Sequence, residues 1–351
     1  MSSLPDEVIL EILSRLPVKP LLRFRCVSKP WLTLIDSQEF IKLHLKHSLK
    51  TNTNRSLILE DYCLYSSDLD SLNRAIQLDN PFKTGTVISG SCNGLICLSK
   101  QKDVALWNPS TRKYRKLPDP MEFPDDGGLV FCQSVIYGFG YDETSDDYKV
   151  MRLVQFFAGE DDSWRSEVKV YSLKNDSWKR VPDCPYYLCY KPSYGMLASG
   201  ALHWVVNPKA ESDTTNLILA FDIGVEEYRL VPQPDFSDKN FHMNVGVLGG
   251  CLTILCIHNN FRLDVWVMKE YGVKESWMKL YSVQPLGYIR LVAYSKSGEE
   301  VLLEKNKCLA WYDIKNSKRV KNVKIQGAPD WFEASICWGS LVPLGGNQGE
   351  E

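Results

Sequence analysis

The 351-residue sequence lacks the features that mark membrane-spanning, secreted and metal-binding proteins. It has no run of about 18 apolar residues, so we expect no membrane-spanning segment. Its first residues have neither the basic start nor the apolar run of a signal peptide. The 11 cysteines, an odd number, include no Cys-x-x-Cys pair, and none lies beside the histidines that a zinc site requires. We therefore expect a soluble intracellular chain with free thiols and no metal site.

The sequence also lacks an excess of charge of either sign. Its 41 Lys and Arg residues nearly balance 43 Asp and Glu residues, which gives a formal net charge of −2. This balance excludes a strongly basic nucleic-acid binder at the level of the whole chain, and it argues against a disordered acidic scaffold. The length predicts two domains, or a small domain followed by a large one.

Residues 4–45 are rich in apolar side chains at helical spacing. Val8, Ile9, Ile12, Leu13 and Leu16 fit one helix, which Pro17 stops, and three further short helices follow. Apolar residues fill 21 of these 42 positions and cover more than one stripe of the first helix. A unit of about 40 residues has too little interior to bury them all. The surplus must be covered by the C-terminal domain or by a separate partner protein.

Within this segment the string Leu4-Pro5-x-Glu7-Val8-x-x-Glu11-Ile12-Leu13-Ser14-Arg15-Leu16-Pro17-Val18-Lys19, followed by Leu21-Leu22-Arg23-Phe24-Arg25-Cys26-Val27-Ser28-Lys29-x-Trp31, resembles an F-box. The resemblance implies that the helices dock on a Skp-family adaptor, which links them to a cullin–RING ubiquitin ligase. It also implies the residues of the docking surface and its immediate support: Leu4, Pro5, Val8, Ile12, Leu16, Pro17, Leu21, Leu22, Cys26, Val27 and Trp31. Pro30 departs from the family pattern, but proline is tolerated at a helix start.

From about Arg55 onward the helical period gives way to short apolar runs bounded by turn residues, which predicts strands. A unit recurs in which an aromatic is followed by another aromatic seven positions later and by proline at eleven. The copies start at Trp107, Tyr171 and Phe221, with looser copies at Trp266 and Trp311. Units of 45–50 residues with about four strands have the size of a propeller blade. Residues 56–78 form a partial blade, whose missing strand the C-terminal run 333–338 could supply. About six blades are predicted, with five or seven left open.

The repeats resemble the type 1 F-box-associated domain of plants, which is similar to kelch and galactose-oxidase propellers. The strings that carry the resemblance are Ser91-Cys92-Asn93-Gly94-Leu95, Trp107-Asn108-Pro109-Ser110-Thr111, Tyr137-Gly138-Phe139-Gly140-Tyr141-Asp142 and Gly200-Ala201-Leu202-His203-Trp204. The expected fold is therefore mainly β, with a C-terminal β-propeller of about six blades preceded by a small all-α F-box helical domain. We expect the helical domain at 1–46, a linker at 47–54, the propeller at 55–345 and a disordered tail at 346–351.

No constellation of catalytic residues stands out. The glycines of Tyr137-Gly138-Phe139-Gly140-Tyr141 are not a phosphate loop, because no helix follows them. The acid pairs Asp146/Asp147 and Asp161/Asp162 are expected to be solvated loop residues. No nucleophile–base pairing is visible either, although such a pairing can be made in space. We expect a non-catalytic protein without a cofactor.

Extra residues between the first two repeats fall in two predicted loops, 119–128 and 156–167, and a third aromatic loop covers 186–190. Aromatics beside charges suit a protein-recognition rim, although these side chains could equally fold back on their own blades. The candidate target-binding residues are Phe156, Phe157, Trp164, Tyr186, Tyr187 and Tyr190.

The resemblance implies a substrate-recognition subunit of a Skp–cullin–F-box ubiquitin ligase, which presents a target protein for ubiquitination and proteasomal degradation. The whole pattern is similar to plant F-box proteins that limit immune-receptor levels and to pollen F-box proteins of self-incompatibility. We expect the protein in the cytoplasm and nucleus, without a nucleic-acid partner. Two alternatives stay open: an adaptor-bound scaffold outside ubiquitination, and a ligand-binding or enzymatic propeller.

Overall fold

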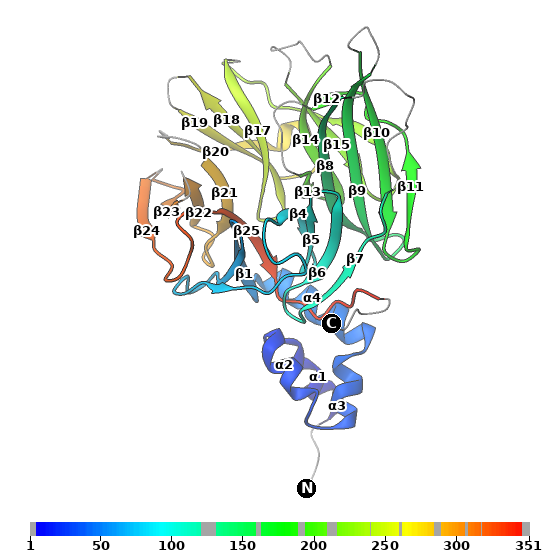
Figure 1. The fold of residues 1–351 in the computed structure, drawn as a ribbon. Coiled ribbons are helices and arrows are strands. Elements are labelled where there is room, and N and C mark those ends of the chain that lie inside the picture. The colour runs from blue at the N-terminus through cyan, green and yellow to red at the C-terminus, as the bar shows by residue number, and fades with distance from the viewer. Residues whose placement is uncertain are drawn as a thin grey trace. The chain divides into compact units, whose positions relative to one another are not determined.

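Four helices and six β-sheets make up the computed structural model of the chain (Figure 1). The structure describes residues 5–120, 131–158, 163–188, 194–208, 216–238, 240–259, 262–283, 289–305, 308–316 and 318–345, with the backbone alone for 131–133, 157, 158 and 163. The sheets are the blades of a six-bladed propeller, so the predicted fold class is confirmed. Two compact units are present, one made of Met1–Thr86, Ser91–Lys116 and Ile325–Glu351, the other of Val87–Gly90 and Leu117–Lys324. The predicted tail, 346–351, lies outside the described residues.

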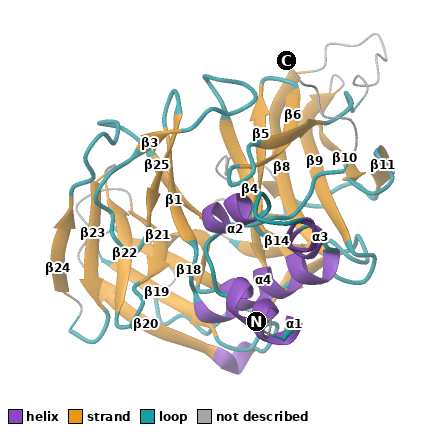
Figure 2. Cartoon of the chain, turned by 90° about the horizontal axis from the view of Figure 1, so that it is seen from below, coloured by secondary structure: helices purple, strands orange, loops and turns teal. Residues whose placement is uncertain are grey.

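The α-helices of the described chain all lie before residue 52 (Figure 2). They are α1 (Asp6–Ser14), α2 (Val18–Phe24), α3 (Lys29–Ile35) and α4 (Gln38–Thr51). Serine hydroxyls cap two of them: Ser28 Oγ accepts from the Trp31 amide at 3.4 Å, and Ser37 Oγ accepts from the Phe40 amide at 3.2 Å. Helix α4 extends to Thr51, so it includes most of the segment 47–54, which was expected to be a linker.

The first unit contains one complete blade and all of a second blade except Val87–Gly90 of its strand β4. One has the strand order β25 (Glu333–Trp338), β1 (Arg55–Glu60), β2 (Leu64–Asp68) and β3 (Ile76–Gln77). The other has the order β4 (Val87–Cys92), β5 (Leu95–Lys100), β6 (Asp103–Asn108) and β7 (Lys113–Lys116). Strand β25 pairs antiparallel with β1, with Glu60 opposite Glu333. The prediction that the C-terminal run supplies the missing strand is confirmed.

The second unit contains four blades, whose cores lie between successive sheets. Their strands are β8 (Phe131–Asp142), β9 (Asp147–Ala158), β10 (Ser163–Ser172) and β11 (Ser177–Val181); β12 (Tyr187–Leu188), β13 (Met196–Ala198), β14 (Ala201–Asn207), β15 (Leu217–Asp222) and β16 (Tyr228–Val231); β17 (Phe241–Leu248), β18 (Cys251–His258), β19 (Leu263–Met268) and β20 (Trp277–Val283); and β21 (Ile289–Tyr294), β22 (Glu300–Lys305), β23 (Cys308–Asp313) and β24 (Lys318–Val323). A single 3-10 turn, η1 (Lys274–Ser276), precedes β20.

The sequence repeat corresponds to the third and fourth strands of a blade. Its two aromatics are cross-strand partners: Tyr171 is opposite Trp178, with ring centroids 5.4 Å apart, and Phe221 is opposite Tyr228, at 5.0 Å. Such pairs stabilise antiparallel sheets. The repeat's proline carbonyl accepts a hydrogen bond from a tryptophan indole, from Trp178 to Pro118 at 2.7 Å and from Trp277 to Pro232 at 2.8 Å. The spacing of seven residues between the two aromatics therefore corresponds to the hairpin turn that joins the third strand to the fourth.

Asn108, the last residue of β6, holds the C-terminal segment in the first unit. Its Nδ2 donates to the carbonyls of Ser340 and Val342, both at 3.0 Å, while its Oδ1 accepts from two turn amides. The side chain is fully buried. Every polar atom of this amide is therefore used.

We predict that Asn108→Ala lowers the free energy of unfolding by about 2–4 kcal/mol, because it leaves buried carbonyls and amides without partners. Urea unfolding followed by tryptophan fluorescence measures this change. The exposed Asn322→Ala serves as the control and should stay within about 0.5 kcal/mol of the wild type. Equal stability of the two variants would contradict this role of Asn108.

Candidate functional site

The helical segment exposes more large apolar side chains than its size explains. Of the fifteen exposed large hydrophobics in the described chain, six lie before residue 50: Val8, Ile12, Val27, Leu32, Leu43 and Leu49. Val8 and Ile12 lie four residues apart on α1 and therefore share one face, and their exposed fractions are 41% and 49%. Apolar surface of this kind marks a protein-binding site.

The structure divides the predicted adaptor-binding residues by exposure. Exposed are Pro5, Val8, Ile12, Pro17, Cys26 and Val27; half-buried are Leu16, Leu22 and Trp31. Leu21 is fully buried and can only support the surface, and Leu4 lies outside the described residues. Sequence reasoning missed Leu32, Leu43 and Leu49, whose exposure depends on how α3 and α4 pack.

The helices are held together beneath this surface by a few specific contacts. The rings of Phe24 and Trp31 meet edge to face at 5.5 Å. The fully buried His44 donates from Nε2 to the carbonyl of Leu16 at 2.8 Å, which ties α4 to the residues after α1. Burial lowers the pKa of His44 although this hydrogen bond opposes the shift, so the imidazole is neutral at physiological pH.

The predicted loop at 156–167 is wrong as a loop. Residues 156–158 and 163–167 belong to β9 and β10, so the extra residues lengthen a hairpin: β9 has 12 residues and β10 has 10. The reason is that residues 150–158 are rich in β-branched, aromatic and other apolar side chains, which favour a strand over a loop. In the third predicted loop, Tyr187 and Leu188 form β12, paired with β14. Most of the remaining predicted loop, 121–128, lies outside the described residues.

The candidate target-binding aromatics do not form one surface. Trp164 and Tyr187 meet edge to face at 6.1 Å, and both are half-buried. Phe156 is opposite Arg165 in the ladder, so its side chain points to the other face from that of Trp164. Tyr186 packs against the core between two blades. The side chain of Phe157 and the whole of Tyr190 lie outside the described part of the chain.

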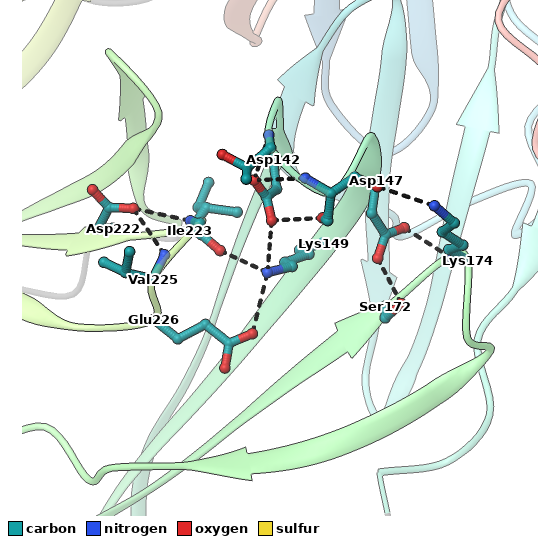
Figure 3. Close-up of polar contacts among 12 residues, drawn as sticks. Asp142, Asp147, Lys149, Ser172, Lys174, Asp222, Ile223, Val225 and Glu226 are labelled. Carbon is teal, nitrogen blue, oxygen red and sulfur yellow. Dashed lines mark hydrogen bonds and ion pairs between the residues drawn. The ribbon is translucent and has the colours of Figure 1, made fainter.

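A lysine in the second unit whose side chain is only 11% exposed joins the turns of two blades (Figure 3). Lys149 Nζ lies 3.0 Å from Asp142 Oδ2, 3.2 Å from Glu226 Oε1 and 2.9 Å from the Ile223 carbonyl. Burial lowers the pKa of Lys149, but the two carboxylates outweigh burial and raise it above its ordinary value. Burial likewise raises the pKa of Asp142, and hydrogen bonds from Ser145 and Lys149 bring it down to about 2.

Asp147 belongs to the same region and corrects the prediction of a solvated acid. It is 5% exposed, and its carboxylate accepts from Ser172 Oγ at 2.6 Å and from the Lys174 amide at 2.9 Å (Figure 3). Asp146 is exposed, as predicted, and Asp161 and Asp162 lie outside the described residues. The described contacts of Asp142, Lys149 and Asp147 are with other groups of the fold, so their role is structural.

Other titratable groups are also used within the fold. His203 is buried between the Met196 carbonyl and the Tyr271 hydroxyl, at 3.0 and 2.6 Å, and burial lowers its pKa to about 4. The nine described cysteines are free thiols. Within the described residues, no group of three or more His, Cys, Asp or Glu side chains could hold a metal ion. The longest described helix, α4, has 14 residues, and no helix is long and apolar enough to cross a membrane.

Comparison with known proteins gives one family for each part of the chain. Residues 1–43 match the F-box domain, and residues 55–334 match the F-box associated beta propeller domain. The chain is 39% identical over 371 residues to the F-box protein CPR1 of Arabidopsis thaliana, which covers 97% of this chain and 89% of that protein. It is 32% identical over 339 residues to the F-box/kelch-repeat protein At3g23880 of the same plant, which covers 90% and 89%.

A solved structure also shares the fold. A chain in the crystal structure of a nidogen/laminin complex aligns with a TM-score of 0.50 and 10% identity, covering 82% of this chain and 99% of that one. At this identity the likeness concerns the fold alone.

We predict that Lys149→Met lowers the free energy of unfolding by about 2–4 kcal/mol, because it leaves the buried Asp142 carboxylate without its cation. The matched control is Lys179→Met, which removes the other cation of Glu226, 2.8 Å away but 71% exposed, and should change stability by about 0–1 kcal/mol.

In the wild type, the contribution of the ionised Asp142 to the free energy of unfolding is present above about pH 4 and is lost as the pH falls towards 2. Urea unfolding at pH 7 and pH 3 measures both effects, and equal losses in the two variants would refute the role of Lys149.

Proposed function

The chain belongs to the F-box proteins that carry an F-box-associated β-propeller, and from this premise we propose that it is a substrate receptor of a Skp–cullin–F-box ubiquitin ligase. The helices dock on a Skp-family adaptor and the propeller holds a target protein. The observation that carries the proposal is the exposed apolar surface of α1 and its neighbours, in the same segment that matches the F-box domain.

The mechanism requires no bond chemistry from this chain. A receptor that holds a target beside a charged ubiquitin-conjugating enzyme raises the effective concentration of the target's lysines. The buried carboxylates, lysine and histidine of the propeller that we describe are occupied by partners within the fold. This supports a non-catalytic subunit, and we propose proteasomal degradation of the target as its outcome.

The resemblance to F-box proteins that limit immune-receptor levels makes an immune receptor the first target to test. Trp164 and Tyr187 are the best placed of the candidate target-binding residues, because they contact each other and stay partly exposed. Large aromatics of this kind supply much of the binding energy in protein interfaces. We place the complex in the cytoplasm and nucleus.

We predict that Ile12→Ala weakens adaptor binding about tenfold or more while leaving the melting temperature unchanged, because the side chain is half in solvent before the adaptor covers it. The adjacent Leu13→Ala, at a site only 1% exposed, should instead lower the free energy of unfolding by about 2–4 kcal/mol. Co-expression with a Skp-family adaptor, co-elution and calorimetry measure the binding. The exposed Val225→Ala is the matched surface control, and an Ile12→Ala variant with full affinity would remove α1 from the interface.

We predict that the wild-type chain shortens the half-life of a co-expressed immune receptor, and that Ile12→Ala abolishes this effect. Trp164→Ala should also abolish it while retaining adaptor co-elution, because that side chain lies in the propeller. A cycloheximide chase with and without a proteasome inhibitor gives the half-lives. Adaptor binding with no change in turnover of any tested receptor would favour the scaffold alternative.

A further inference from the structure

The fourth strand of every blade, an edge strand in its sheet, lacks acidic residues, and every one of these strands except β3 carries Lys or Arg. These strands are β3, β7, β11, β16, β20 and β24. They contain no Asp or Glu and ten Lys or Arg residues: Lys113, Arg115, Lys116, Lys179, Arg180, Arg229, Lys279, Lys318, Arg319 and Lys321. Because the chain as a whole has 41 basic and 43 acidic residues, this bias is specific to the edges. Positive charge on an edge strand discourages pairing with other chains.

Several of these cations are neutralised by an acid nearby. Lys179 lies 2.8 Å from Glu226, Arg229 lies 3.7 Å from Asp222, and Lys279 lies 2.9 Å from Asp264. Their charge is therefore part of the ion-pair structure of the second unit. Protection of edge strands against pairing with other chains is enough to explain these three cations.

Strand β24 differs in that its three cations are all exposed and lie within four residues of one another. Residues 314–329 contain five Lys or Arg residues and no Asp or Glu. Lys318 is opposite Asp313 in the ladder, but Arg319 is opposite Tyr312 and Lys321 is opposite Trp311, and among the described residues neither has an ion-pair partner. Residues 318–322 are all exposed, so neither face of the strand is covered, and β23 occupies only one of its edges.

The sequence contains a second basic string almost identical in composition, and the structure distinguishes the two. Lys113-Tyr114-Arg115-Lys116 forms β7, and Lys318-Arg319-Val320-Lys321 begins β24. On β7, Tyr114 is the cross-strand partner of the buried Trp107, and the half-buried Arg115 donates to the Leu344 carbonyl at 3.4 Å. On β24, Arg319 has no such acceptor and Val320 is 50% exposed.

We propose that β24 is a nuclear-import signal, read by an import receptor that binds extended Lys/Arg segments in an acidic groove. A short Lys/Arg-rich string is the sequence form of such a signal. The strand presents it in extended form with Lys318, Arg319 and Lys321 exposed, and of these three cations only Lys318 lies opposite an acid, Asp313. Complementary charge then gives the receptor both attraction and register.

The same observations favour a protein groove over a nucleic acid as the occupant. The net charge of −2 leaves no broad positive field, and the three exposed cations of β24 lie within four residues of a single strand. The single extended strand β24 suits the acidic groove of an import receptor, which accepts one extended segment. The inference goes beyond the ligase assignment and does not depend on it, because adaptor docking uses the helices at the other end of the chain.

The test uses the full-length chain fused to a tandem fluorescent protein, which is too large for passive entry into the nucleus. The variant Lys318→Gln/Lys321→Gln is compared with Lys113→Gln/Lys116→Gln, which removes the same charges at the same spacing from β7. We expect the β24 variant to lose about tenfold or more in affinity for a purified import receptor and its nuclear signal in plant cells. The β7 variant should retain both, and Lys318→Arg/Lys321→Arg should retain both as well.

Three outcomes would overturn the proposal: wild-type affinity of the β24 variant for the receptor, equal losses in the two Gln variants, or loss of duplex DNA binding in the β24 variant with unchanged import. Adaptor co-elution is measured on every variant. Because β24 lies far along the chain from the helices, a variant that keeps the adaptor but loses import separates this inference from the ligase proposal.

Discussion

The antiparallel pairing of β25 with β1 is the interaction on which the rest of this structure depends. It brings residues 333–338 to the strand that begins at Arg55, so one blade contains both ends of the repeat region. Without it, β1 and the end of the chain would each present an open strand edge. The close approach also explains Gly94, whose φ is 81° and where a Cβ would collide with the side chain of Ser340.

The same pairing fixes the helices to the first blade. Helix α4 ends at Asn52, which has a left-handed φ of 52°, and Asn54 lies just before β1. The Gly339 amide donates to the Asn54 carbonyl at 2.6 Å, and Asn54 Nδ2 donates to Ser48 Oγ of α4 at 2.8 Å. The docking helices and the C-terminal segment thus meet at one residue.

Ion pairs join neighbouring blades in the second unit, whereas α1 exposes apolar side chains. In the second unit, the acids at turns capture lysines and arginines from neighbouring strands, as Glu226 does with Lys149 and Lys179. The adaptor-binding side of α1, in contrast, offers Val8 and Ile12. Burial of apolar side chains supplies the affinity there, whereas ion pairs supply register between blades. On β24, Arg319 and Lys321 are exposed and have no ion-pair partner among the described residues.

Much of the fold could be predicted because its signals are local. The aromatic spacing of seven reports a hairpin, and the pairing of Trp107 with Tyr114 follows from it directly. The missing strand of the first blade was also predictable, because a partial blade must be completed by a run elsewhere in the chain. The candidate site was less accessible. The helical period identifies Leu21 and Ile12 as apolar alike, and only packing buries the first completely and leaves the second 49% exposed.

The sequence by itself determined the order of helices and strands, the repeat and the family, since each depends on residues that are close along the chain or on a motif, whereas the six sheets of the structure fixed the blade count. Only the tertiary structure decided which of these residues face solvent. It turned a predicted loop into the extended β9–β10 hairpin and buried Asp147 under Ser172 and Lys174. It also separated β24 from β7. Their compositions are nearly equal, but a side chain's exposure is set by neighbours distant in sequence, such as Leu344 beside Arg115, and no local pattern records those.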